Sequence, residues 1–237
     1  MVVERSNDGQ EPLAAVLCSG GLDSAVLVAR EAAAGVVQPL YVSGGLAWEQ
    51  SELAVVERLL AAPTFAASVR PLARLAAPLA DLYPPSHWAL RGTPPAYGTP
   101  DSDVYLVGRN AVLLSKAAVY CALHGIARIA VGPLAGNPFP DATPEFFAAM
   151  AHALSLGLDH PLDIVAPFAS LGKPDVILLG ATLGVPWELT VSCMNPVETA
   201  HCGRCSKCRE RLQAFDAAGI HDPAPYAFRP ADVSTGR

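Results

Sequence analysis

The chain has 237 residues and a mass of 24.7 kDa, and 51% of its residues are apolar while 16% are charged. This much apolar surface offsets the entropy of ordering, so the composition excludes an intrinsically disordered chain. The formal charge of −6 argues against a protein whose main task is to hold nucleic acid. With neither a bilayer-length apolar run nor an apolar leader, we expect a cytoplasmic protein without membrane contact.

The first part of the chain alternates between strand and helix patterns. Residues 13–18 form a short apolar run that suits a buried strand, and a helix pattern follows over 24–34. A second strand is expected over 36–42 and a second helix over 48–62. This alternation is typical of a parallel sheet with helices on its faces.

The stretch 83–103 interrupts the alternation. It contains five prolines and two glycines, which exclude a regular element. Inside a compact domain a loop of this length is usually a lid or a binding loop, and the alternative is a mobile surface loop. The sequence leaves both interpretations open.

Strand and helix patterns return after this stretch, followed by an irregular, proline-containing tail from His221. Strands are expected over 128–131 and 162–165, and helices over 110–124, 144–156, 173–183 and 211–218. The fold class that we predict is α/β, with a doubly wound, mainly parallel sheet. We expect one domain over 1–185, and a C-terminal metal-binding segment over 186–237 that packs on it.

A glycine-rich segment, Ser-Gly-Gly-Leu-Asp-Ser at 19–24, lies between the first strand and the first helix. Its glycines let the backbone approach a ligand, and the helix start suits an anion. The spacing is neither that of a Walker motif nor that of a dinucleotide motif. Asp23 would repel a bare phosphate, but it suits a magnesium ion shared with pyrophosphate. The alternative is a glycine-rich turn in which Asp23 or Ser24 caps the helix.

Four of the six cysteines crowd into the segment 193–208. They are Cys193, Cys202, Cys205 and Cys208. In a reducing compartment this clustering favours a closed, structural zinc site over disulfides. The alternatives are unliganded cysteines, an iron–sulfur cluster, or His201 as a rival ligand beside Cys202. Cys18 is expected to be a small buried group, with a reactive thiol as the alternative.

Segment 19–24, following an N-terminal strand, resembles the pyrophosphate loop (PP-loop) of the N-type ATP pyrophosphatases. Together with the cysteine cluster it makes the chain similar to the 7-cyano-7-deazaguanine synthase family of queuosine biosynthesis. The resemblance covers 13–220, with 83–103 unmatched. The further matching residues are Val107-Gly108-Arg109-Asn110, the run 139–146, Pro167-Phe168, Lys173, Gly184-Val185-Pro186 and Thr190-x-Ser192-Cys193.

This resemblance implies an ATP-dependent ligase that adenylates 7-carboxy-7-deazaguanine. Ammonia displaces AMP to give an amide, and a second ATP drives conversion of the amide to the nitrile. The family also suggests a homodimer. The residues expected to hold ATP and magnesium are Ser19, Gly20, Gly21, Leu22, Asp23, Ser24, Arg109 and Asn110. Of these, Asp23 and Ser24 would be catalytic.

The resemblance also implies that Lys173 is catalytic, because a cation would stabilise the charge on the leaving phosphates. The alternative is a surface lysine at a helix start. Asp141 and Glu49 would contact the substrate, since a carboxylate accepts hydrogen bonds from a guanine-like edge. The alternative for Asp141 is a turn or cap residue of the helix from Pro144.

Three segments depart from the family pattern on the base and amine side of the site. The family usually has Tyr-Gly-Gln-Arg-His where this chain has residues 44–49, and only Glu52 keeps its place. Residues 134–137 and Ala142 also differ. These departures leave open a PP-loop enzyme that uses another amine acceptor or thiolates tRNA, or a non-catalytic nucleotide-binding protein. Trp48 could stack on a base, with a core position as the alternative.

Overall fold

The computed structural model describes residues 13–229, and five parallel strands form one sheet in the order β3-β2-β1-β4-β5. The strands are β1 (Ala14–Leu17), β2 (Val37–Ser43), β3 (Ala73–Ala76), β4 (Arg128–Ala130) and β5 (Asp163–Val165). Residue Ala15 of β1 lies opposite Gln38 of β2 and Ile129 of β4. The chain therefore winds outward in both directions from β1, which confirms the doubly wound α/β class.

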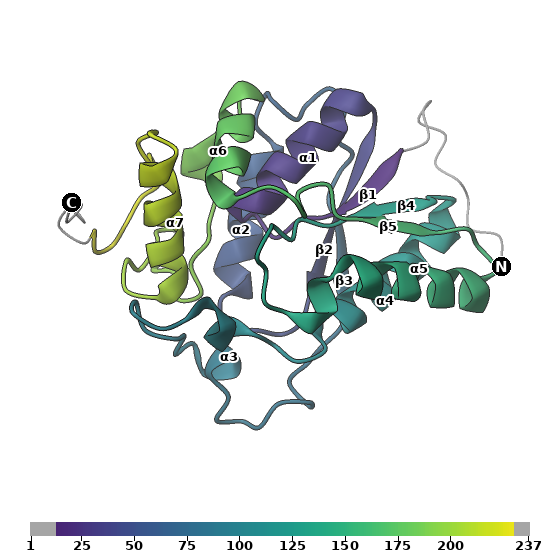
Figure 1. Cartoon of the computed structure of the whole chain (residues 1–237), viewed down its shortest axis with the longest axis horizontal. Helices are drawn as coiled ribbons and strands as arrows, with labels where there is room; N and C mark the ends of the chain where they lie inside the picture. Colours follow the sequence, from purple (N-terminus) through teal and green to yellow (C-terminus); the bar gives the residue numbers. More distant parts are fainter. Residues whose placement is uncertain (1–12, 230–237) are drawn as a thin grey trace.

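Helices cover both faces of the sheet (Figure 1). The helices are α1 (Leu22–Ala34), α2 (Glu49–Leu60), α3 (Trp88–Arg91), α4 (Arg109–His124), α5 (Pro144–Leu158), α6 (Lys173–Thr182) and α7 (Ser206–Ala217). Short 3-10 turns are η1 (Asp101–Val104), η2 (Pro140–Ala142) and η3 (Trp187–Leu189). Within residues 13–229, no helix is both long enough and apolar enough to cross a membrane.

Two buried clusters lie on the two faces of the sheet, because successive side chains of a strand point to opposite sides. Val16 belongs to the cluster that contains apolar residues of α1, α2 and α6. Its neighbour Ala15 belongs to the cluster with Leu114 of α4 and Phe147 of α5. Each of these two β1 residues thus contributes to one core only.

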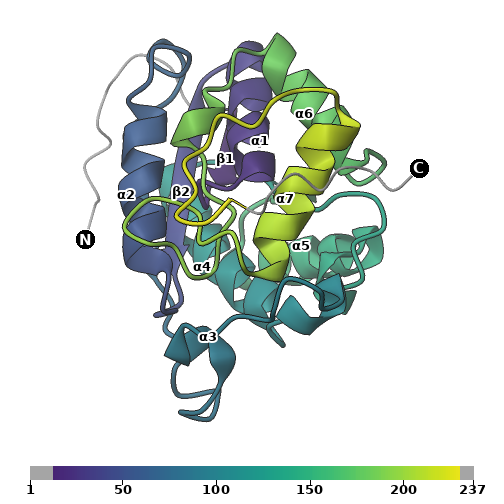
Figure 2. The same cartoon turned by 90° about the vertical axis from the view of Figure 1, so that its left-hand side faces the viewer.

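The C-terminal segment shares the first of these cores. Trp187 of η3 packs edge to face on Phe215 of α7, with ring centroids 5.5 Å apart. Both rings belong to the buried cluster that contains residues of α1, α2 and α6. Figure 2 shows α7 beside α6. Gly180 of α6 lets these elements approach, since a methyl group there would overlap the Trp187 ring and lie 2.6 Å from Val26.

The expectation that no regular element forms in the segment 83–103 was wrong. One helical turn, α3, is capped by His87, whose side chain accepts from the Ala89 N–H at 3.3 Å. Gly92 ends the turn in the left-handed region at φ 69°. Trp88 of this turn stacks on Trp48 with ring centroids 5.7 Å apart and 9° between planes.

The same segment is anchored to α7. The Arg209 guanidinium donates to the carbonyls of Tyr97 at 2.6 Å and Thr99 at 2.7 Å, and it pairs with Asp101 at 2.7 Å. Trp48 is only 4% exposed, in a cluster with Leu46 and Leu106. Trp48 is therefore a core residue that holds this segment against α2.

Candidate active site

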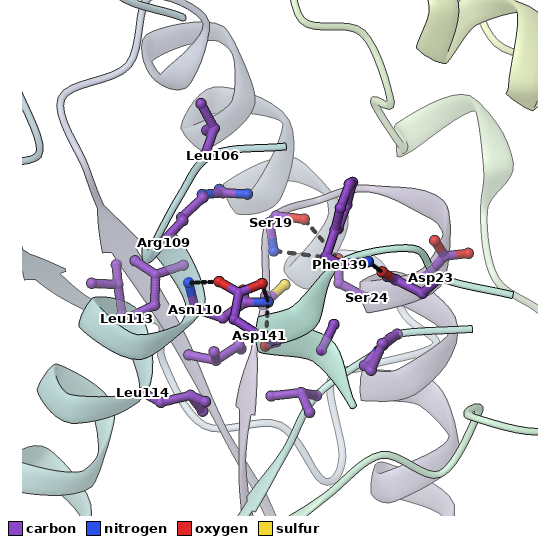
Figure 3. Close-up of a pocket in the computed structure, with 18 of the residues that line it drawn as sticks. Ser19, Asp23, Ser24, Leu106, Arg109, Asn110, Leu113, Leu114, Phe139 and Asp141 are labelled. Carbon is purple, nitrogen blue, oxygen red and sulfur yellow. Dashed lines mark hydrogen bonds between the residues drawn. The ribbon is translucent and has the colours of Figure 1, made fainter. Parts of the chain in front are cut away.

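A cavity of about 290 Å³ opens at the carboxyl ends of β1, β2 and β4. It lies where the winding reverses, which is the position where open α/β sheets bind ligands. Figure 3 shows Ser19, Asp23 and Ser24 on one side and Arg109, Asn110 and Asp141 on the other. The structure thus brings residues of the glycine-rich segment together with the start of α4.

The glycine-rich segment forms a compact cradle at the N-terminus of α1. Ser24 Oγ donates to the Gly21 carbonyl at 3.0 Å and accepts from the Ser19 N–H at 3.3 Å. Gly20 has φ 71°, and a methyl group there would lie 2.9 Å from Val56 Cγ2, so this position requires glycine. Gly21 occupies the N-cap position without a side-chain capping bond. Neither Asp23 nor Ser24 caps the helix, and the helix start faces the cavity side.

Asp23 joins this cradle to two other helices through an ion-pair network. Asp23 Oδ2 lies 3.3 Å from Lys173 Nζ at the start of α6. Lys173 also pairs with Glu210 of α7, which in turn pairs with Lys207 at 2.5 Å. Lys173 is therefore a paired, largely buried residue and not a surface lysine.

The two partners of this network hold each other in their charged forms. Burial alone would lower the pKa of Lys173, but Asp23 and Glu210 raise it above its ordinary value. Burial alone would raise the pKa of Glu210, but Lys173 and Lys207 lower it to about 2. Both groups therefore stay charged at neutral pH.

The second carboxylate oxygen of Asp23 is suited to a cation. Asp23 Oδ1 is buried and has no hydrogen-bond partner within the described chain. An unsatisfied buried carboxylate oxygen carries a desolvation cost that a bound cation removes. A hard cation such as Mg²⁺, which prefers oxygen ligands, fits this atom.

Asp141 fixes the start of α4 while it lines the cavity. Its Oδ2 accepts from the Asn110 backbone N–H at 3.1 Å. The Asn110 side-chain amide donates to the Asp141 carbonyl at 3.0 Å and to Oδ1 at 3.3 Å. The helix that follows Asp141 is capped instead by Thr143, whose Oγ1 accepts from the Phe146 N–H at 3.1 Å. Asp141 therefore orders the helix that carries Arg109.

The two glutamates at the start of α2 occupy different places. Glu49 is buried and accepts from Ser43 Oγ at 2.6 Å, Gly44 N at 2.7 Å and Gly45 N at 3.0 Å, so it closes the turn after β2. Among the described residues, the cavity lining includes Glu52 and not Glu49. Burial raises the pKa of Glu52 to about 7, against the lowering effect of Arg109. Glu49 and Glu52 are three residues apart, so they lie on the same side of the helix, and this spacing does not tell which of the two side chains reaches the cavity.

Further cavity residues were not singled out from the sequence. Tyr105 and Phe139 stack with centroids 5.1 Å apart and 18° between planes, and both line the cavity. Such an aromatic pair offers a flat apolar surface of the kind on which a base stacks. Tyr105 lies just before the Val-Gly-Arg-Asn run, and Phe139 begins the run 139–146. Their closeness in sequence to these motifs is the feature from which their place in the cavity could have been predicted.

The isolated cysteines are buried groups. Cys18 lines the cavity, and burial raises its pKa to about 11. Cys121 lies in the core under α4, and burial raises its pKa to about 12. Both thiols are therefore protonated at neutral pH, which disfavours nucleophilic roles.

The four clustered cysteines converge on one point next to α7. The four sulfur atoms lie within 4.8 Å of one another. Backbone N–H groups donate to three of the sulfurs, from Asn195 and Cys202 to Cys193, from Gly203 to Cys208, and from Arg204 to Cys202. These donors stabilise thiolates, so the set fits a closed, four-coordinate metal site.

His201 is turned away from this metal site. Its Nε2 accepts from the Ser192 N–H at 3.0 Å, and its ring stacks on Tyr226 with centroids 4.8 Å apart. Gly203 is needed for the cysteine loop, because its φ is 73° and a methyl group there would overlap the Phe228 carbonyl oxygen. The structure thus favours the four-cysteine set over the set with His201.

The doubly wound sheet, the cradle at the end of β1 and the four-cysteine cluster together define a nucleotide-binding PP-loop enzyme with a metal-binding segment. The family described as "Queuosine biosynthesis protein QueC" matches residues 13–219, and this chain belongs to it.

The similar proteins include relatives that carry the name 7-cyano-7-deazaguanine synthase. The one from Methanopyrus kandleri is 38% identical over 89% of this chain and 97% of its own length. The one from Koribacter versatilis is 34% identical over 97% of this chain and 98% of its own length. The one from Methanothrix thermoacetophila is 36% identical over 90% of this chain and 98% of its own length.

Proposed function

We propose that this enzyme converts 7-carboxy-7-deazaguanine and ammonia to 7-cyano-7-deazaguanine at the expense of two ATP. The names of its relatives support this product. The observation that carries the proposal is the cavity that the cradle of α1 and the start of α4 line together. We propose that ATP binds on the side of the cradle and the flat carboxylate substrate on the side of α4.

In the first stage, the substrate carboxylate attacks the α-phosphorus of ATP. The bond to the β-phosphate breaks, and pyrophosphate leaves with the electron pair. The N–H groups at the start of α1 and the Ser19 and Ser24 hydroxyls bind the pyrophosphate, and Lys173 stabilises its growing charge. Asp23 would hold magnesium, which would offset phosphate charge. Ammonia then attacks the acyl carbon, the bond to AMP breaks, and the amide forms.

In the second stage, the amide oxygen attacks the α-phosphorus of a second ATP. Pyrophosphate leaves as before, and AMP then departs with the former amide oxygen while the nitrogen loses its protons. The product is the nitrile. Because both stages release pyrophosphate from ATP, the same cradle can serve both of them.

We propose that Asp141 holds the substrate opposite the cradle, and that Arg109 and Asn110 contact the nucleotide. Asp141 keeps its position through Asn110, and it lines a cavity large enough for a purine-like ring. The Tyr105–Phe139 pair offers a stacking surface. Glu49 would act on the substrate indirectly, because its carboxylate fixes the turn between β2 and α2.

For the four-cysteine cluster we propose zinc, since four thiolates leave no open coordination position and suit a structural role. Ammonia is the proposed nitrogen donor, the homodimer the proposed assembly, and the cytoplasm the proposed location. Light scattering of the purified, metal-loaded chain tests the dimer.

The deciding experiment incubates the purified chain with ATP, magnesium, ammonium and 7-carboxy-7-deazaguanine, with products read by mass spectrometry. The nitrile together with AMP and pyrophosphate is the expected result. The amide alone would assign the second activation elsewhere. If no AMP forms, 7-carboxy-7-deazaguanine is not the substrate. Loss of pyrophosphate release in the Asp23→Asn variant would show that the chain turns ATP over and does not only bind it.

A further inference from the structure

A group in the cavity that removes a proton from nitrogen would speed the amide step. At neutral pH most ammonia is ammonium, which has no lone pair with which to attack. A cavity that uses ammonium must therefore attract a cation and then take its proton. Carboxylates are the side chains that do both.

Three carboxylates line the cavity within the described chain, namely Asp23, Glu52 and Asp141. Asp23 faces Lys173 at 3.3 Å, and Asp141 accepts hydrogen bonds from the Asn110 backbone and side chain. Glu52 forms no ion pair in the part of the chain that the structure describes. It is therefore the cavity carboxylate that, among the described residues, forms neither an ion pair nor a helix-capping hydrogen bond.

The surroundings of Glu52 come from four elements and are mostly uncharged. The groups that interact with its carboxylate are Cys18 at the end of β1, Tyr41 of β2, Trp48 and Glu49 at the start of α2, and Arg109 of α4. Of these, the Tyr41 and Trp48 side chains hydrogen-bond to it. Burial and the charge of Glu49 raise the pKa of Glu52, and Arg109 lowers it, so that it stands at about 7. A base with a pKa near the operating pH exchanges protons efficiently.

We propose that Glu52 binds ammonium in the cavity and accepts its proton, which frees the nitrogen lone pair to attack the adenylated carboxylate. The lone pair forms the C–N bond, and the C–O bond to AMP breaks with its electrons leaving on AMP. The second proton that the nitrogen sheds leaves to water. This assignment rests on the proposed function, and it gives Glu52 a role in the amine half of the reaction and none in adenylation.

The test uses Glu52→Gln, which removes the charge and the proton acceptor but keeps the shape. Carboxylate-dependent exchange of pyrophosphate into ATP reports adenylation alone. Amide formation from ammonium at pH 7 reports the step that needs the base. Hydroxamate formation from hydroxylamine, which is a free base at neutral pH, reports the same attack without the first proton transfer. Glu57→Gln, on the exposed side of the same helix, is the matched control.

We expect Glu52→Gln to keep exchange and hydroxamate formation, while amide formation falls by about 100-fold or more. Glu57→Gln should leave all three rates unchanged. An equal fall with both nucleophiles, unchanged amide formation or loss of exchange would each overturn the assignment while leaving the proposed function intact. Absence of exchange in the unmodified chain would overturn the proposed function, and this assignment with it.

Discussion

Arg211 and Asp222 form a buried ion pair that joins α7 to the C-terminal tail, and its removal should destabilise the fold strongly. The two side chains are 0% and 1% exposed, and two guanidinium nitrogens lie 2.8 Å from the two carboxylate oxygens. Arg211 also donates to Thr190 Oγ1 at 2.8 Å and to the Trp187 carbonyl at 3.1 Å. Arg211→Met keeps the aliphatic stem but leaves Asp222 as an unpaired buried charge.

The expected loss is about 3–5 kcal/mol in the free energy of unfolding, the usual cost of breaking one side of a buried pair. For a chain of this size, that corresponds to a fall in Tm of roughly 6–20 °C. Urea unfolding and thermal melts of the metal-loaded, full-length chain measure it. The matched control is Arg74→Met, because Arg74 pairs with Glu57 at the surface and is 59% exposed. This control should cost less than about 1 kcal/mol.

A loss for Arg211→Met that equals the loss for Arg74→Met would refute the reasoning. So would a double variant, Arg211→Met with Asp222→Asn, that is no more stable than Arg211→Met alone, since removing the unpaired charge should recover stability. The pH dependence has a definite sign as well. Burial would raise the pKa of Asp222, but the hydrogen bonds and charge of Arg211 lower it. Its contribution is therefore present above the unfolded-state pKa and is lost as the pH falls through the folded-state pKa.

Three further predictions concern the cradle and the metal centre. Cys205→Ser should release the metal, measured by elemental analysis, and lower Tm; an unchanged Tm would contradict a structural role for the metal. Gly20→Ala should weaken ATP binding in calorimetry more than Gly45→Ala, because both residues have positive φ (71° and 78°) but only Gly20 would contact Val56. Equal effects would remove the close approach as the cause. Lys173→Met should slow pyrophosphate release by about 100-fold or more, and an unchanged rate in a phosphate-coupled assay would exclude a role for its charge.

The sequence was sufficient for β1, the glycine-rich segment and α1, because a short apolar run, two glycines and a helix pattern follow each other without a break. The strand β3 was missed, because Ala73–Ala76 lies at the sheet edge with alternate residues exposed, and its apolar content is weak. The helix α7 begins at Ser206 and not at Arg211, since the cysteine spacing hides the helical pattern of its first turns. Pattern alone could not delimit it.

The site shows the same limit. Asp23 and Ser24 could be placed from the motif, because chain order fixes them at the end of β1. Which of Glu49 and Glu52 reaches the cavity depends on the rotation of α2. Tertiary contacts such as the stacking of Trp48 on Trp88, a residue far away in sequence, accompany that rotation and have no local pattern. The anchoring of 83–103 by Arg209 is likewise a long-range contact without a local pattern. The division into 1–185 and 186–237 stays a prediction.

The core that α1 shares with Trp187 and Phe215 has a consequence for biosynthesis. The ribosome makes α1 among the first elements, but the residues that complete its buried surface come near the end of the chain. Until then, Val26 and its neighbours lack part of their apolar cover, and the nascent chain carries an exposed apolar face. We therefore expect a premature stop between α6 and α7 to give an aggregating fragment that chaperones retain.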